Sequence, residues 1–289
     1  MTDVVQTRDE LAIARAALQG SVALVPTMGA LHEGHRSLLR VASAVADTVV
    51  VSIFVNPLQF APTEDLDRYP RTLDADLAMC AAEGVALIFA PSRDQMYPRE
   101  QVVRVDAGPI GRLYEGASRP GHFDGVLTVV AKLFGLVCPD TAVFGRKDAQ
   151  QLALVRQMVT DLELPVRIEA APLIRDSDGL ALSSRNRYLS AEQRQSALAL
   201  SHALNAGLQA ARSGLSAAEV VAATRIVLDQ ATGVEIDYVA LVDEASFEPV
   251  EPTPACGDVP VSAVLALAAS VGSTRLIDNV SVTIGEVTT

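Results

Sequence analysis

The first 173 residues alternate between apolar runs typical of strands and amphipathic patterns typical of helices. Strand-like runs occupy residues 21–25, 48–55, 85–90, 141–144 and 166–174. Helical patterns separate them at residues 35–46, 73–83, 123–137 and 148–162, and Thr7 is placed to cap a further helix over residues 8–18. This alternation predicts an α/β domain built on a mostly parallel, doubly wound sheet with helices on both faces.

The pattern changes close to residue 173. A polar loop at residues 175–179 leads to two alanine-rich helical stretches, at 191–212 and 216–231. Strand-like runs follow at 234–242, 261–268 and 274–284. Helices followed by strands predict a smaller α+β domain. We therefore expect two domains, over residues 1–173 and 174–289.

Residues 26–35, Pro-Thr-Met-Gly-Ala-Leu-His-Glu-Gly-His, connect the first apolar run to an amphipathic stretch. A helix N-terminus at this position offers backbone N–H groups and a positive dipole, which suit a phosphate. His32 and His35, with Gly34 between them, could face that phosphate together. Zinc is disfavoured because a His-Glu-x-x-His helix needs four-residue spacing and no cysteine lies close in sequence. An incidental pair of histidines is the simple alternative.

Lysine is scarce in this chain, since only Lys132 and Lys147 occur among 23 basic side chains. Lys147 follows the strand predicted at 141–144, where Gly145 ends the strand and Asp148 can cap the next helix. A compact ammonium at the carboxyl end of a strand suits a phosphate site. The alternative is a surface turn that happens to contain one lysine.

Other loops carry polar residues with weaker signals. Ser183, Ser184 and Arg185 together could clamp a polyphosphate, although Ser and Arg are common in loops. Gln59 and Gln151 could hold the hydroxyl groups of a small substrate, or could be surface amides.

Two carboxylates at a predicted helix start raise the possibility of a metal. Asp74 and Asp76 could contribute to a Mg²⁺ site, which usually takes one or two carboxylates together with phosphate oxygens. They could equally be charges favoured by the helix dipole. Asp76 is thus a weak candidate as a metal ligand.

The composition limits the classes of partner. A net charge of −12 over 289 residues argues against general binding of nucleic acid and against an anionic membrane surface. Three cysteines, Cys80, Cys138 and Cys256, lie far apart without a CxxC spacing, which favours a reduced, cytoplasmic compartment. Any phosphate site must then be a local basic pocket in an acidic protein.

Several segments, taken together and in order over roughly residues 20–190, resemble the pantothenate synthetase (pantoate–β-alanine ligase) family. The histidine loop alone marks only a nucleotidyltransferase superfamily, but the ordered set is specific. The matching segments are residues 25–35, 52–60, 69–72, 119–123, 144–151 and 178–186.

The resemblance implies a Rossmann-like domain that binds ATP and pantoate, a smaller C-terminal lid domain and a homodimer. It also implies two half-reactions. The carboxylate of (R)-pantoate attacks the α-phosphorus of Mg²⁺·ATP, giving pantoyl adenylate and pyrophosphate. The amine of β-alanine then displaces AMP and gives pantothenate. ATP, pantoate and β-alanine would be the partners, without nucleic acid or membrane.

The resemblance also assigns residues to roles. His32, His35 and Lys147 would stabilise the reacting phosphorus and the pyrophosphate, with His35 as proton donor, and Ser183, Ser184 and Arg185 would hold the outer phosphates. Gln59 and Gln151 would bind pantoate, with Met28 packed against it. The expected ATP-binding set is Met28, Gly29, Gly34, Gly145, Asp148, Ile174 and Leu182. The chain departs from the family at Arg146, where Glu is expected, and at Gly135, where Asn is expected.

Two other functions remain open on the residues. A simple nucleotidyltransferase would leave the nucleotide on its product, whereas the ligase would release AMP once an amine is added. A nucleotide sensor without catalysis would not need Lys147, both histidines and the loop at 183–185 together.

Overall fold

The computed structural model describes residues 2–62, 64, 66–250 and 260–285. The chain forms two compact units. The N-terminal unit contains Met1–Arg146 and Leu154–Leu173, and the C-terminal unit contains Lys147–Ala153 and Ile174–Thr289. The short segment Lys147–Ala153 therefore belongs to the C-terminal unit, although it precedes the boundary expected at residue 173.

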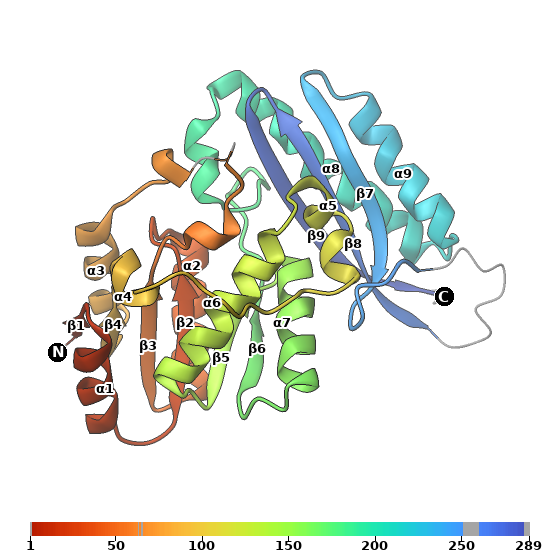
Figure 1. The fold of residues 1–289 in the computed structure, drawn as a ribbon. Coiled ribbons are helices and arrows are strands. Elements are labelled where there is room, and N and C mark those ends of the chain that lie inside the picture. The colour runs from red at the N-terminus through yellow and green to blue at the C-terminus, as the bar shows by residue number, and fades with distance from the viewer. Residues whose placement is uncertain (1, 63, 65, 251–259, 286–289) are drawn as a thin grey trace. The chain divides into compact units, whose positions relative to one another are not determined.

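A parallel sheet forms the centre of the N-terminal unit (Figure 1). Within the described residues it has six strands in the order β1-β4-β3-β2-β5-β6, and each neighbouring pair is parallel. The strands are β1 (Asp3–Val5), β2 (Val22–Thr27), β3 (Thr48–Ile53), β4 (Leu87–Phe89), β5 (Thr141–Gly145) and β6 (Arg167–Ala171). The predicted doubly wound α/β fold is confirmed, and β1 is an edge strand that the apolar pattern did not indicate.

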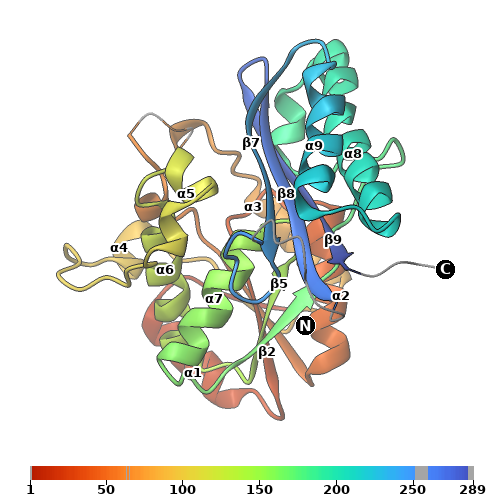
Figure 2. The same cartoon turned by 90° about the vertical axis from the view of Figure 1, so that its right-hand side faces the viewer.

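Helices cover both faces of this sheet, as Figure 2 shows. One face carries α1 (Arg8–Ala17) packed on α6 (His122–Val137), and the other carries α2 (Glu33–Val45) packed on α3 (Leu73–Ala82). The remaining helices are α4 (Arg93–Met96), α5 (Glu115–Ser118), α7 (Ala149–Asp161) and the short 3-10 turns Pro57–Gln59, Leu66–Arg68 and Ile110–Arg112. Among the described residues, no helix has both the length and the apolar character needed to cross a bilayer.

The strands are buried on both faces, which explains their continuous apolar sequences. Val22, Leu24 and Val25 on β2 have no exposed surface, and Val50 on β3 has none either. Burial of such side chains stabilises the fold by roughly 1.5–3 kcal/mol each. Because the strands are parallel, their carboxyl ends share one edge, where the loops after Thr27, Ile53 and Gly145 emerge.

The C-terminal unit is an antiparallel sheet, β7-β8-β9, packed against two helices (Figure 1). Its elements are α8 (Ala191–Arg212), α9 (Ala217–Asp229), β7 (Val234–Asp243), β8 (Val261–Val271) and β9 (Thr274–Ile284). Both helices begin with capping boxes, formed by Ser190 with Gln193 and by Ser216 with Glu219. The smaller α+β unit expected from the sequence is therefore present.

Candidate active site

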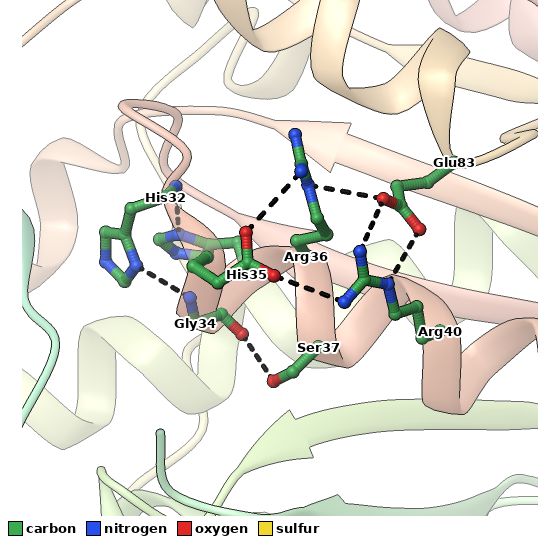
Figure 3. A network of polar contacts seen from close by, with 8 residues as sticks. His32, Gly34, His35, Arg36, Ser37, Arg40 and Glu83 are labelled. Atoms are coloured by element: carbon green, nitrogen blue, oxygen red, sulfur yellow. Dashed lines mark hydrogen bonds and ion pairs between the residues drawn. The ribbon is translucent and has the colours of Figure 1, made fainter. Parts of the chain in front are cut away.

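The loop after β2 places two histidines at the start of α2 (Figure 3). His32 is the N-cap, and its Nδ1 accepts a hydrogen bond of 3.1 Å from the Gly34 amide. His35 Nδ1 in turn accepts from the His32 amide at 3.3 Å, which completes a reciprocal capping box. The ring centroids are 4.2 Å apart. Imidazole nitrogens thus perform the capping that Ser, Asp or Glu side chains usually provide.

These hydrogen bonds determine where the proton of each neutral ring lies. An amide N–H can only donate, so Nδ1 of His32 and Nδ1 of His35 are both acceptors. The proton of a neutral ring is then on Nε2, the nitrogen that can donate to a phosphate oxygen. The helix N-terminus adds the positive end of its dipole at the same point.

The turn that precedes His32 is held from neighbouring elements. The Thr27 hydroxyl donates to the Ser52 carbonyl at 2.8 Å and accepts from the Gly29 amide at 3.3 Å. Gly29 and Ala30 both have positive φ, of 82° and 51°. Asp76 on α3 accepts the Ala30 and Leu31 amides at 3.0 and 2.8 Å. Tertiary contacts therefore keep a non-glycine residue in the left-handed region.

Asp76 does not fit the metal-ligand role considered from the sequence. Its side chain is buried, and its oxygens accept two backbone amides and the Thr72 hydroxyl. Asp74, its sequence neighbour, is exposed. Within the described residues, no group of three His, Cys, Asp or Glu side chains is arranged to hold a metal ion.

An ion-pair network joins Arg36 and Arg40 of α2 to Glu83 at the end of α3 (Figure 3). Arg36 and Arg40 both contact Glu83, at 3.2 and 3.1 Å, and both contact Glu33, at 3.5 and 3.2 Å. The side chains are partly exposed, and surface ion pairs contribute roughly 0–1 kcal/mol each. The network connects the end of α3 to α2.

The loop after β3 fixes the orientation of the Gln59 amide. Its Oε1 accepts from Asn56 Nδ2 at 3.1 Å, and its Nε2 lies 3.1 Å from the sulfur of Met28. Asn56 Oδ1 accepts from the Tyr97 hydroxyl at 2.9 Å, so the orientation of Asn56 is fixed as well. Gln59 therefore presents donor N–H groups beside Met28, which suits recognition of a hydroxyl or carboxylate oxygen.

His122 and Arg119 hold the backbone of the same loop. His122 Nδ1 lies 2.8 Å from the Gln59 carbonyl, and its Nε2 lies 3.0 Å from Arg119 Nη1. A carbonyl only accepts and a guanidinium only donates, so the ring is neutral with its proton on Nδ1. Burial, followed by the charge of Arg119, lowers the pKa of His122 to about 4. Arg119 also pairs with Glu64 at 2.7 Å.

In the C-terminal unit, the backbone of Lys147 is anchored by β9. Asn279 Nδ2 donates to the Lys147 carbonyl at 2.8 Å, and the Lys147 ammonium lies 3.7 Å from Asp148 Oδ1. The neighbouring Asp278 is buried and accepts two hydrogen bonds from Arg175, at 2.6 and 2.9 Å. Burial raises the pKa of Asp278, while the Arg175 guanidinium acts in the opposite direction.

The loop with Ser183, Ser184 and Arg185 is also ordered within the C-terminal unit. The Leu182 amide donates to the Ile174 carbonyl at 3.0 Å. The Ser183 hydroxyl accepts from the Arg185 amide and so caps the 3-10 turn Ser184–Tyr188. These contacts place the serines and the arginine on a defined turn.

The predicted site residues thus form two sets, each ordered within its own unit. The N-terminal unit contains Met28, Gly29, His32, Gly34, His35, Gln59 and Gly145. The C-terminal unit contains Lys147, Asp148, Gln151, Ile174, Leu182, Ser183, Ser184 and Arg185. Tyr97, Asn279 and the supporting role of Asp76 were missed by sequence reasoning. Asn279 lies on β9 among other polar residues, such as Arg275, Asp278 and Ser281, so no distinct sequence signal sets it apart.

The fold and the loop geometry define an α/β protein with two histidines at a helix N-terminus, and comparison with known proteins identifies its family. The sequence profile of the pantoate-beta-alanine ligase family matches residues 1–281. A pantothenate synthetase of Acidothermus cellulolyticus is 62% identical over 276 residues, which cover 96% of this chain and 90% of that protein. One from Thermobifida fusca is 58% identical, with 97% and 96% covered.

Solved structures agree with the sequence comparison. A pantothenate synthetase from Thermus thermophilus matches with a TM-score of 0.88 and 46% identity, covering 96% of this chain and 98% of that one. A pantoate-beta-alanine ligase from Francisella tularensis, complexed with beta-gamma ATP and beta-alanine, matches with a TM-score of 0.77 and 32% identity over 97% of both chains.

This chain therefore belongs to the pantoate-beta-alanine ligase family. It is an ATP-dependent ligase of pantothenate biosynthesis, which condenses pantoate with β-alanine through a new carbon–nitrogen bond. The resemblance and the activity expected from the sequence are both confirmed.

Proposed function

We propose that the condensation runs through an enzyme-bound pantoyl adenylate and that the two sets of site residues divide its chemistry. In the first step a carboxylate oxygen of (R)-pantoate forms a bond to the α-phosphorus of ATP, and the bond to pyrophosphate breaks. In the second, the β-alanine amine forms a bond to the acyl carbon, the bond to AMP breaks, and the amine loses a proton.

The capping arrangement of His32 and His35 is the observation that carries this proposal. Because both Nδ1 atoms accept backbone amides, Nε2 is the donor of each neutral ring. Two such donors at a helix N-terminus can stabilise negative charge that develops on the phosphate oxygens. His35 is proposed to donate a proton to the leaving pyrophosphate.

The remaining roles follow the chemistry of each side chain. Gln59 and Gln151 bind the pantoate oxygens, with Met28 packed against its carbon atoms. Lys147, Ser183, Ser184 and Arg185 bind the outer phosphates, since an ammonium, hydroxyls and a guanidinium all donate to them. Gly29, Gly34, Gly145, Asp148, Ile174 and Leu182 hold the nucleotide.

Magnesium belongs to the proposal as the companion of ATP. The contacts of Asp76 leave it unsuited as a ligand, and we assign no protein ligand to the ion. Mg²⁺ retains several waters and binds phosphate oxygens readily, so the nucleotide itself can carry it. We derive no step through the ion.

Assembly and location are also part of the proposal. The family resemblance supports a homodimer, and sedimentation should then give twice the 30.5 kDa mass of one chain. A monomer at working concentration would contradict this.

A cytoplasmic location is supported by the cysteines, since Cys80 and Cys138 are free thiols in the structure and Cys256 lies outside the described residues. Residues 174–289 are proposed to serve as the lid that protects the adenylate from hydrolysis.

Order of addition tests the two-step reaction. With ATP and pantoate alone, the enzyme should form pyrophosphate and a bound adenylate in a single turnover. AMP and pantothenate should appear only after β-alanine is added. Formation of ADP and phosphate, or a nucleotide that stays attached to the final product, would contradict the proposal.

A further inference from the structure

The carboxylate of Asp76 occupies the concave side of the turn that leads to His32. Gly29 and Ala30 have successive positive φ angles, and the amides of Ala30 and Leu31 point to the same side. Successive backbone N–H groups of this kind form a concavity that binds anions. Here the anion is a side chain of the protein, with one carboxylate oxygen on each amide, at 3.0 and 2.8 Å.

Asp76 is itself held firmly in place. The residue is 2% exposed, and it lies in the first turn of α3, where the helix dipole favours a negative charge. The Thr72 hydroxyl donates to Oδ1 at 3.1 Å, and the Asp76 amide bonds the Thr72 carbonyl at 2.9 Å. A rigid helix thus supports the turn across a separation of 46 residues.

The carboxylate of Asp76 packs closely against the turn at residues 29–31, so a displacement of one requires a displacement of the other. A Cβ on Gly29 would lie 3.0 Å from Asp76 Oδ2 and 3.2 Å from Ile53 Cγ2, so backbone and carboxylate are closely packed. Ala30 at φ 51° is a strained position for a residue with a side chain. His32, the N-cap of α2, directly follows Leu31 in the chain. A change at Asp76 is therefore transmitted to the two rings.

We propose that Asp76 is a positioning residue of the adenylation step: its carboxylate fixes the turn at residues 29–31 and so sets the location of His32 and His35. This inference rests on the proposed role of the two histidines. A displacement of about 1 Å in a reacting group can reduce a rate on the order of 100-fold. Loss of the carboxylate should therefore slow adenylate formation more than it weakens binding of ATP.

Asp76→Asn and Asp74→Asn form a matched pair for the test. Both remove one negative charge from the first turn of α3, but only Asp76 contacts the loop. We expect Asp76→Asn to lower the single-turnover rate of adenylate formation about 10-fold or more, with a smaller change in KM for ATP. Hydrogen exchange of the Ala30 and Leu31 amides should become faster. Asp74→Asn should change neither quantity.

Two further variants keep the test informative should Asp76→Asn fold poorly. Thr72→Val removes the hydroxyl that holds Asp76 and should give a weaker effect in the same direction. Asp76→Ala leaves both amides without an acceptor, and added formate should restore part of the adenylation rate by filling the vacated position. Sodium chloride at the same ionic strength should not.

The outcomes separate the two levels of the proposal. Unchanged amide exchange in Asp76→Asn, or a raised Mg²⁺ requirement without faster exchange, would overturn the positioning role. Faster exchange with an unchanged adenylation rate would overturn it too, provided that His35→Ala is slow. Normal adenylation by His35→Ala would instead refute the proposed function of the histidine.

Discussion

Lys147 is the lysine within the segments predicted to bind phosphate. Asn279 donates a hydrogen bond to its carbonyl, which fixes the backbone position from which the side chain extends. We expect Lys147→Ala to lower kcat about 100-fold, comparable to the loss of one transition-state donor. Steady-state assay of pantothenate formation measures this.

The second lysine provides the control for that experiment. Lys132 lies on α6 with its ammonium 5.7 Å from the centre of the Tyr97 ring. Lys132→Ala removes the same charge from the protein, and the ammonium of Lys132 contacts Tyr97 and none of the described residues that are proposed to bind phosphate or substrate. Equal losses in the two variants, or near-normal turnover in Lys147→Ala, would remove Lys147 from the mechanism.

His122 makes stability depend on pH. Its pKa falls from 6.5 to about 4 on folding, chiefly through burial. The unfolded chain therefore takes up a proton first as the pH falls, and stability that is present above pH 6.5 is lost toward pH 4. The shift corresponds to about 3 kcal/mol at most. Urea unfolding at several pH values should show this loss in the native protein.

A variant isolates that contribution from the other acidic groups. His122→Gln keeps a donor and an acceptor but does not titrate, so its free energy of unfolding should fall less steeply between pH 6.5 and pH 4. Parallel pH profiles for the two proteins would show that His122 does not retain its neutral form on folding.

At the level of single residues, the sequence identified chemistry better than geometry. It placed His32 and His35 at a helix start, because a glycine turn and an amphipathic run surround them. It could not show that each Nδ1 accepts a backbone amide, since that depends on the turn. The contact of Asp76 with Ala30 spans 46 residues, and no local pattern encodes it.

At the level of elements, two glycines of α6 predict opposite effects on stability. A Cβ on Gly135 would meet nothing within 4 Å, whereas a Cβ on Gly125 would lie 2.2 Å from the Leu58 carbonyl oxygen. Gly135→Ala should stabilise the protein by about 0.5–1 kcal/mol through helix propensity. Gly125→Ala should destabilise it by roughly 1–3 kcal/mol through overpacking.

Thermal and denaturant unfolding of the two variants decide between these effects. Gly125→Ala should also raise KM for pantoate, because the clash falls on the loop that carries Gln59. A stabilised Gly125→Ala, or a destabilised Gly135→Ala, would contradict the packing described for α6.

Long elements were predictable because their burial repeats over several turns or residues. The helix expected at 191–212 is α8, and the strand expected at 274–284 is β9. Strand β1 has three residues and α4 and α5 have four each, too few for a periodic pattern to develop. Such short pieces depend on tertiary contacts, as when β1 pairs with β4.

At the level of the whole molecule, the central claim is that pantoate is activated as its adenylate. The family and the ATP dependence fit this path, and the residues proposed to bind the phosphates and the pantoate oxygens carry donor groups. This path determines the fate of one oxygen atom of pantoate. A pantoate carboxylate oxygen becomes bonded to the α-phosphorus and leaves with AMP.

Oxygen-18 labelling of the pantoate carboxylate tests this claim most directly. The enzyme is given labelled pantoate, ATP and β-alanine, and the products are separated and analysed by mass spectrometry. The account predicts one labelled oxygen in the phosphate of AMP and one retained in the amide carbonyl of pantothenate. Unlabelled AMP, or label in inorganic phosphate, would contradict it.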